Sequence, residues 1–383
     1  MKWYQIDIFM IGKNKSKSNA QKKCFMNLVH IGGKDFAKNC SDELTCILDS
    51  SLSPKNIPPS LLVLLKNIKD QGIKNKTQLN FMLNLQLFLQ RLGEFSQSME
   101  VRKLIYNSSC TNRILQSKIM IDTGKIPKLN TVNMINCRSK IDFHILMNII
   151  RLKKILRRTE FTNNVFENVQ QSKQFSDLVY RKRIALVGPG FTDSNLGKEI
   201  DSHDVIVRIN IKGDSNLPNE ITHGSKTHVL YLNGRWSREF KIDNYKNLIS
   251  NSCYVVFRNN IWSTKIKRSH TLVPLDFVEL SGSFLMLPRI LVDLVRFNPE
   301  VINIYNSDFY SGITPYTENF KTIHQGANLW QLAGHDLITN LNFTNFIINN
   351  VRTKITFDNP FYKNGVLDIS KYIALMNARK LSW

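Results

Sequence analysis

Short runs of apolar and mostly β-branched residues recur along the second half of the chain, separated by polar segments with turn residues. Runs of this length between turn signals predict buried strands. Patterns with helical spacing lie between or after several of these runs. Strands that alternate with helices predict a mostly parallel sheet with helices on both faces. The expected strands are 184–188, 204–210, 227–233, 253–257 and 300–306, and the expected helices are 193–201, 283–297 and 336–350.

The first half of the chain has a different pattern. From 78 to 116 apolar residues follow helical spacing with a break near Gly93, which predicts a helical hairpin. Helical spacing returns over 143–180. We therefore expect an α/β fold with a Rossmann-like, mostly parallel sheet and flanking helices at 178–383, preceded by a mainly helical region at 1–177. We also expect the second unit to fold and bind nucleotide on its own.

Composition bounds the class of protein. Hydrophobic residues make up 42% of the 383 residues, enough for a sizeable core, and no apolar run reaches the roughly 18 residues of a membrane-spanning helix. The start of the chain lacks the charge order and apolar length of a signal peptide. The six cysteines are scattered without a C-x-x-C pair, which favours reduced thiols. These features predict a cytoplasmic location.

The chain is strongly basic, with 52 Lys and Arg against 30 Asp and Glu, and most of the net charge of +22 lies in residues 1–180. Such an excess favours anionic partners: nucleotides, nucleic acid or acidic membrane surfaces. One interpretation is a basic nucleic-acid- or membrane-binding protein whose α/β domain is not catalytic. The chain has no helix-turn-helix, zinc-finger or aromatic RNA-binding pattern, which disfavours nucleic acid. The basic N-terminal region stays a candidate for contact with an acidic membrane surface.

Gly188 and Gly190 follow the first predicted strand and precede a helix whose predicted cap is Thr192 or Asp193. Glycines permit close approach of the backbone to a phosphate, and a helix N-terminus favours an anion. A dinucleotide site would need a third glycine at position 193 and an acid after the second strand. The chain has Asp193 and Asn210 at these positions, which disfavours an NAD-dependent oxidoreductase.

Three segments carry a resemblance to a known family. The run GKEIDSHDVIVRIN at 197–210, followed by GSKT at 224–227, resembles the large sialylmotif of the sialyltransferases of glycosyltransferase family 29. The segment at 280–310, which begins LSGSFLMLP, resembles the small sialylmotif. The segment GHDLITN at 334–340 resembles the very short sialylmotif, with His335 at the histidine position.

The resemblance implies a sialyltransferase-like fold and an inverting transfer of sialic acid, or a related sugar, from a CMP-sugar donor to an acceptor hydroxyl on a glycan. It implies that His335 is the base that takes the acceptor proton. The chain has no Asp-x-Asp pair in 181–383, so we expect a metal-independent reaction with no cofactor besides the donor substrate. The candidate nucleotide-binding residues are Gly188, Gly190, Asn210, Ser281 and Gly282.

The chain departs from the family pattern at several positions. Ile184 stands where the family has a disulfide cysteine, Pro189 replaces a polar residue, and Asn340 replaces a glutamate. Pro288 falls inside the helix expected after the small-motif turn, so it should begin or kink that helix.

Other polar residues of these segments have structural interpretations. We expect the imidazole of His203 to fix the turn before the second strand, Asp201 and Asp204 to serve as cap and turn residues, and Asp336 to cap the helix that follows it. His324 is interpreted as structural.

Overall fold

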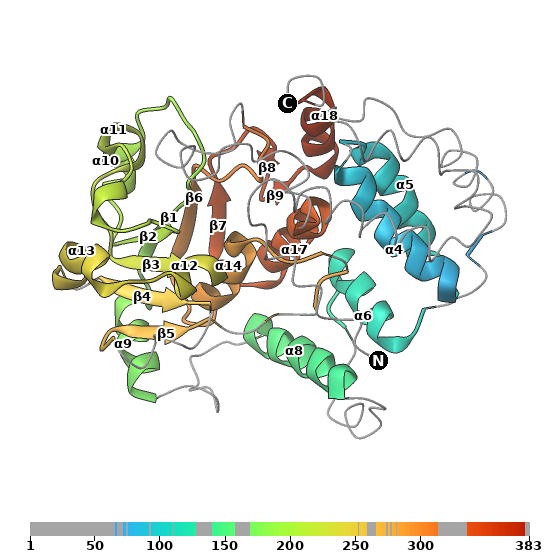
Figure 1. The fold of residues 1–383 in the computed structure, drawn as a ribbon, viewed down its shortest axis with the longest axis horizontal. Coiled ribbons are helices and arrows are strands. Elements are labelled where there is room, and N and C mark those ends of the chain that lie inside the picture. Colours follow the sequence, from blue (N-terminus) through green and yellow to red (C-terminus); the bar gives the residue numbers. More distant parts are fainter. Residues whose placement is uncertain are drawn as a thin grey trace.

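The computed structural model describes residues 66, 72–73, 76–91, 93–109, 111–127, 140–157, 169–251, 253–258, 266–272, 275, 278–280, 282–312 and 335–379. Within these residues, seven strands form one sheet in the order β5-β4-β3-β2-β1-β6-β7, and all neighbouring pairs are parallel (Figure 1). The predicted α/β fold with a Rossmann-like parallel sheet and flanking helices is confirmed. The strands are β1 (Arg183–Val187), β2 (Val205–Ile209), β3 (Val229–Leu232), β4 (Tyr254–Phe257), β5 (Ser269–Thr271), β6 (Val301–Tyr305) and β7 (Lys354–Phe357).

The central strands form where the apolar runs are continuous. Every residue of β2, β3 and β4 is buried, as expected for parallel strands covered on both faces. The sequence patterns missed the two edge strands, β5 and β7, because the segments SHT and KITF are short and partly polar. A small antiparallel pair, β8 (Tyr362–Lys363) and β9 (Val366–Leu367), was also missed.

Helices cover both faces of the sheet. The longest after β1 are α14 (Met286–Val295), α17 (Leu337–Asn350) and α18 (Ile369–Arg379). Pro288 is the third residue of α14 and lies in its first turn, where its missing N–H breaks no intrahelical bond, so the helix accommodates it at its start. The shorter elements are α10 (Gly197–Asp201), η1 (Asp214–Asn216), α11 (Glu220–His223), α12 (Gly234–Arg238), η2 (Ile242–Tyr245) and α13 (Lys246–Ser250).

The predicted start of the helix after β1 is wrong. Helix α10 begins only at Gly197, and its N-cap is Leu196, which makes no side-chain cap bond. Thr192 Oγ1 instead accepts from the N–H of Ser194 in the preceding loop. Gly197 has a packing reason to be glycine, because a Cβ there would collide with the carbonyl oxygen of Glu220.

The helical hairpin predicted before the sheet is confirmed. Helices α4 (Lys76–Arg91) and α5 (Phe95–Tyr106) flank Gly93, which has a φ of 79°. Helices α6 (Arg113–Asp122), α8 (Lys140–Arg157) and α9 (Val169–Val179) follow them. Figure 1 shows the hairpin against α17 and α18, at the opposite end of the molecule from α10 and α11.

These helices share one hydrophobic core with the sheet domain. A single cluster of buried residues contains Phe95, Ile149 and Phe175 together with residues of β1, α14, α17 and α18. Phe95 of α5 packs edge-to-face on Tyr372 of α18, with ring centroids 6.2 Å apart. The boundary at 177/178 stays a prediction, but this packing does not support a second unit that folds alone. Residues 1–65 lie outside the described residues.

None of the described helices is both long and apolar enough to cross a membrane. Cys253 is a free thiol whose pKa burial raises to about 12. The other five cysteines lie outside the described residues.

Candidate functional site

The candidate site lies at the carboxyl edge of the sheet. Strands β2 to β5 follow one another on one side of β1, and β6 and β7 lie on its other side, so the strand order reverses between β1 and β6. Open parallel sheets bind ligands at the carboxyl ends of their strands near such a reversal. The chain leaves this edge at Gly188, Asn210, Asn233, Arg258 and Asn306.

The glycine turn after β1 packs closely on the end of β6. The N–H of Gly188 donates to Tyr305 O at 2.8 Å, and that of Gly190 donates to Asn306 O at 2.9 Å. A Cβ on either glycine would collide with Asn306 O. These glycines therefore allow close contact between two strand ends. Both N–H groups already donate to the end of β6. The role of this turn in phosphate binding therefore stays a prediction, in which other N–H groups of the loop would be the donors.

His223 holds this turn from the opposite side. Its Nε2 lies 3.1 Å from Gly190 O and its Nδ1 lies 2.7 Å from Thr222 Oγ1. Burial lowers the pKa of His223 to about 4, against the hydrogen bond to Gly190 that raises it. The imidazole is therefore neutral at pH 7 and serves as a fixed donor to the loop carbonyl.

Asn210 joins the ends of β2 and β3. It has a φ of 59°, a left-handed conformation that asparagine tolerates better than most residues. Its N–H donates to Tyr231 O, and its Oδ1 accepts from the N–H of Asn233, both at 2.8 Å. Asn233 in turn caps α12 by accepting from the N–H of Trp236 at 3.0 Å. The amide Nδ2 of Asn210 is the part of this side chain that we expect to meet a nucleotide.

The segments 197–210 and 224–227 hold each other. Asp201 accepts from the N–H and Oγ of Ser225, both at 2.8 Å, and from the N–H of Lys226 at 3.1 Å. Burial opposes ionisation of Asp201, but these hydrogen bonds outweigh it and lower the pKa of the carboxyl. Arg208 donates to the carbonyl oxygens of Lys226 and Gly224 at 2.9 and 2.8 Å. Asp201 thus holds the 224–227 loop and is no helix cap.

His203 and Asp204 connect β1, β2 and β6. His203 Nδ1 lies 3.0 Å from Glu199 O, and its Nε2 lies 3.0 Å from Asn303 Nδ2. Asp204 accepts from the N–H of Arg183 at 2.8 Å. The predicted role of His203 in fixing the turn before β2 is confirmed. His203 and Asp204 therefore make hydrogen bonds that connect β1, β2 and β6.

His335 and Ser283, which are far apart in sequence, meet at the start of α14. His335 Nδ1 lies 3.0 Å from Ser283 Oγ. Burial lowers the pKa of His335 to about 4; a hydrogen bond to the backbone of Ser283 raises it, and the charges of Arg258 and Arg289 lower it further. The imidazole is therefore neutral at pH 7. Among the described residues, Nε2 has no hydrogen-bond partner.

The side chain of Asn340 both accepts and donates hydrogen bonds. Its Oδ1 accepts from the N–H of Leu285 at 2.6 Å, just before α14. Its Nδ2 donates to Ser283 O at 3.3 Å, to Asp336 O at 2.9 Å, and to His335 O. An ionised carboxylate cannot donate to these carbonyl oxygens, whereas an amide accepts and donates at once. Asn340 therefore ties the start of α17, where His335 lies, to the turn before α14.

Several predicted residues come together and others do not. Gly282, with a φ of 67°, is exposed and directly precedes Ser283, so it lies beside His335. Gly188, Gly190 and Asn210 lie at other strand ends of the same edge. Ser281 and His324 lie outside the described residues.

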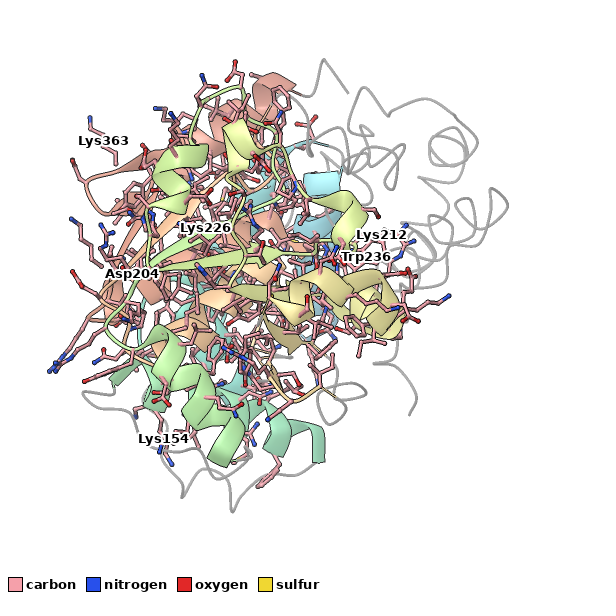
Figure 2. The ribbon with its side chains drawn as sticks, turned by 90° about the vertical axis from the view of Figure 1, so that its left-hand side faces the viewer. Lys154, Asp204, Lys212, Lys226, Trp236 and Lys363 are labelled. Carbon is pink, nitrogen blue, oxygen red and sulfur yellow. The ribbon has the colours of Figure 1, made fainter. Side chains whose placement is uncertain are left out.

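Sequence reasoning missed Arg258. It directly follows β4 at the carboxyl edge, is partly buried, and lies close enough to His335 to lower the pKa of that imidazole. A cation immediately after a buried strand is the signal that would have identified it. Sequence reasoning also missed Trp236, which Lys212 Nζ and the Arg235 guanidinium approach to 5.4 and 5.0 Å of the ring centroid. Lys212 and Trp236 lie side by side in Figure 2.

Neither a comparison with protein-family models nor one with curated proteins finds a match for this chain. Within the described part of the chain, no three side chains of His, Cys, Asp or Glu gather in a way that could hold a metal ion.

Proposed function

We propose that this protein is a glycosyltransferase that moves sialic acid, or a related sugar, from a CMP-sugar donor to an acceptor hydroxyl of a glycan. The resemblance of three segments to sialylmotifs supports the reaction class. The observation that carries the proposal is the 3.0 Å contact between His335 Nδ1 and Ser283 Oγ. It joins the very short and small motif segments at the carboxyl edge of the sheet, where α/β folds bind ligands.

His335 is the base in this proposal. In this proposal Nδ1–H donates to Ser283 Oγ, so Nε2 carries the lone pair that takes the proton of the acceptor hydroxyl as its oxygen attacks the anomeric carbon. The bond from that carbon to the phosphate oxygen breaks, and CMP leaves with the bonding electrons through an oxocarbenium-like state. A pKa near 4 makes the imidazole by itself a weak base. The negative charge of a bound donor beside it favours imidazolium and so strengthens the base.

The electrostatics of the site suit an anionic donor. Arg258 and Arg289 both disfavour a positive charge on the His335 imidazole, so both contribute a positive potential at this position. The same potential attracts the phosphate of CMP and the carboxylate of a sialic acid. The N–H groups at Gly282 and Ser283, close to the N-terminus of the ten-residue helix α14, are the candidate donors to the leaving phosphate.

The test measures binding and transfer separately. Calorimetry with CMP, CDP, UDP and NAD, each with and without EDTA, should give binding of CMP that EDTA does not abolish. His335→Ala and His335→Gln should leave CMP affinity unchanged and reduce transfer from CMP-sialic acid to a galactoside panel by about 10²–10⁴. Glutamine can still bond to Ser283 but cannot act as a base, so equal losses in both variants identify proton transfer as the missing step. A wild-type rate in either folded variant contradicts the assignment of the base.

The alternative is a basic binding protein. It predicts no saturable binding of CMP, together with retention on nucleic acid or acidic vesicles that falls steeply with salt. That combination of results would replace the enzymatic proposal.

A further inference from the structure

The residue that follows His335 is anchored in the N-terminal hairpin. Asp336 is fully buried, and its carboxylate accepts from Gln86 Nε2 at 2.9 Å and Gln90 Nε2 at 2.8 Å, both on α4. Arg102 of α5 donates its Nη1 to both carboxylate oxygens at 3.0 Å. Asp336 also caps α17 by accepting from the N–H of Thr339 at 3.1 Å, as its sequence position predicts. One side chain therefore joins α17 to both helices of the hairpin.

Arg102 is the centre of this buried network. Its side chain is fully buried, and Nη2 donates to Asp122 Oδ2 at 2.6 Å and to Thr339 Oγ1 at 2.8 Å. Tyr106 also donates to Asp122. Burial lowers the pKa of the guanidinium, but Asp122 and Asp336 more than offset this and raise it. A buried ion pair adds little net stability compared with apolar packing, and one of its attested uses is to fix a single geometry.

The turn that carries Ser283 is held from within the sheet domain. Glu279 accepts from the N–H of Phe284, directly after Ser283, at 3.3 Å and pairs with Arg289 of α14 at 3.3 Å. This turn is therefore held by α14, whereas the start of α17 is held by the N-terminal hairpin.

The backbone of Asp336 connects this network to His335. Asp336 has a φ of 41° and a ψ of 81°, a left-handed conformation that is costly for a residue other than glycine and needs support from its surroundings. The network supplies that support at the residue adjacent to His335. Displacement of Asp336 would shift the His335 backbone and its ring, and a displacement of about 1 Å in a catalytic group can cost about 100-fold in rate.

We propose that Arg102 and Asp336 are positioning residues, and that through them the α4–α5 hairpin holds the His335 imidazole in its working orientation. The expected loss of transfer activity rests on the proposed function, but the expected effect on the orientation of the His335 ring does not. The N-terminal helices are then part of the working site and not a separate accessory region.

The experiment uses the full-length protein and the variants Arg102→Lys and Gln90→Met. Lysine keeps the positive charge but loses the forked geometry, and methionine removes one neutral donor to Asp336. Lys103→Met is the matched control, because Lys103 is the next residue of α5 and lies exposed in a pair with Glu100. NMR of protein with labelled histidine follows the His335 ring signal, which His335→Ala identifies among the eight histidines.

Both test variants should shift the His335 ring signal, leave CMP affinity unchanged and lower kcat for transfer by about 10- to 100-fold, without raising KM for the donor. The control should change none of these. An unchanged ring signal in a folded variant overturns the proposal, and so does a normal kcat where the wild type is active. If Arg102→Lys does not fold, the ring signal and kcat of Gln90→Met decide whether the proposal holds. A wild type without CMP binding or transfer would refute the proposed function, while the ring signal would still test the anchor.

Discussion

Replacement of Asn340 by aspartate should destabilise the protein in a way that depends strongly on pH. The two side chains have nearly the same shape, but Asn340 Nδ2 donates to the carbonyl oxygens of Ser283, Asp336 and His335. The side chain is fully buried. An ionised carboxylate would face three carbonyl oxygens with no donor of its own, so the aspartate should be protonated in the folded state.

The cost of that protonation sets the magnitude. An ordinary aspartate has a pKa of about 3.9, and each pH unit above it costs about 1.4 kcal/mol to keep the group neutral. The folded-state pKa is raised, so the variant is penalised most at high pH and recovers as pH falls toward the ordinary value. The variant should lose about 4 kcal/mol at pH 7 and about 1.5 kcal/mol at pH 5 relative to wild type.

Urea unfolding of wild type and variant at both pH values measures this difference. Asn340→Ala is the control, because it leaves the N–H of Leu285 without its acceptor and opens a cavity, at a cost of about 2–4 kcal/mol that does not depend on pH. A loss for Asn340→Asp that is equal at pH 5 and pH 7 would refute the assignment of Nδ2 as the donor to these three carbonyl groups.

Four further changes test other parts of the structure. Asn210→Asp keeps the acceptor for Asn233 but loses Nδ2, so it should weaken CMP binding by about 1–3 kcal/mol in calorimetry; unchanged affinity would leave Asn210 with its strand-joining role only. Gly190→Ala should lower the free energy of unfolding by about 1–3 kcal/mol, because its Cβ meets Asn306 O; wild-type stability would contradict that contact. Burial raises the pKa of Asp293, but Arg296 and His270 outweigh it and hold the pKa at about 2, so this residue contributes stability above pH 4 that is lost as pH falls through about 2. An acid unfolding curve that Asp293→Asn does not flatten would refute this. A 178–383 fragment should not unfold cooperatively, since it lacks Phe95 and Arg102; a stable fragment with full CMP affinity would contradict this and confirm the predicted boundary.

The sheet could be predicted where local pattern and burial agree. Strands β2, β3 and β4 are buried on both faces, and their continuous apolar runs reflect that environment. Edge strands β5 and β7 pair on one side only and tolerate polar residues, so the same signal was weak there. The capping error at Thr192 has a different cause. Helix α10 begins at Gly197, where the backbone lies so close to Glu220 that a Cβ would collide with its carbonyl oxygen. No local sequence pattern records this contact between two segments.

The candidate site shows the same limit more sharply. No local pattern predicted that Ser283 contacts His335, and none indicated that Asp336 pairs with Arg102, 234 residues earlier. A signal existed within the hairpin: Gln86 and Gln90 are four residues apart on α4, and Ser98 and Arg102 are four apart on α5. Polar pairs at this spacing on otherwise apolar helix faces predict a buried polar seam, because each pair lies on one face. The change from helical to strand pattern near 178 marks a change in local structure. Which residues unfold together depends instead on the side chains that share the hydrophobic core and the buried network of Arg102 and Asp336.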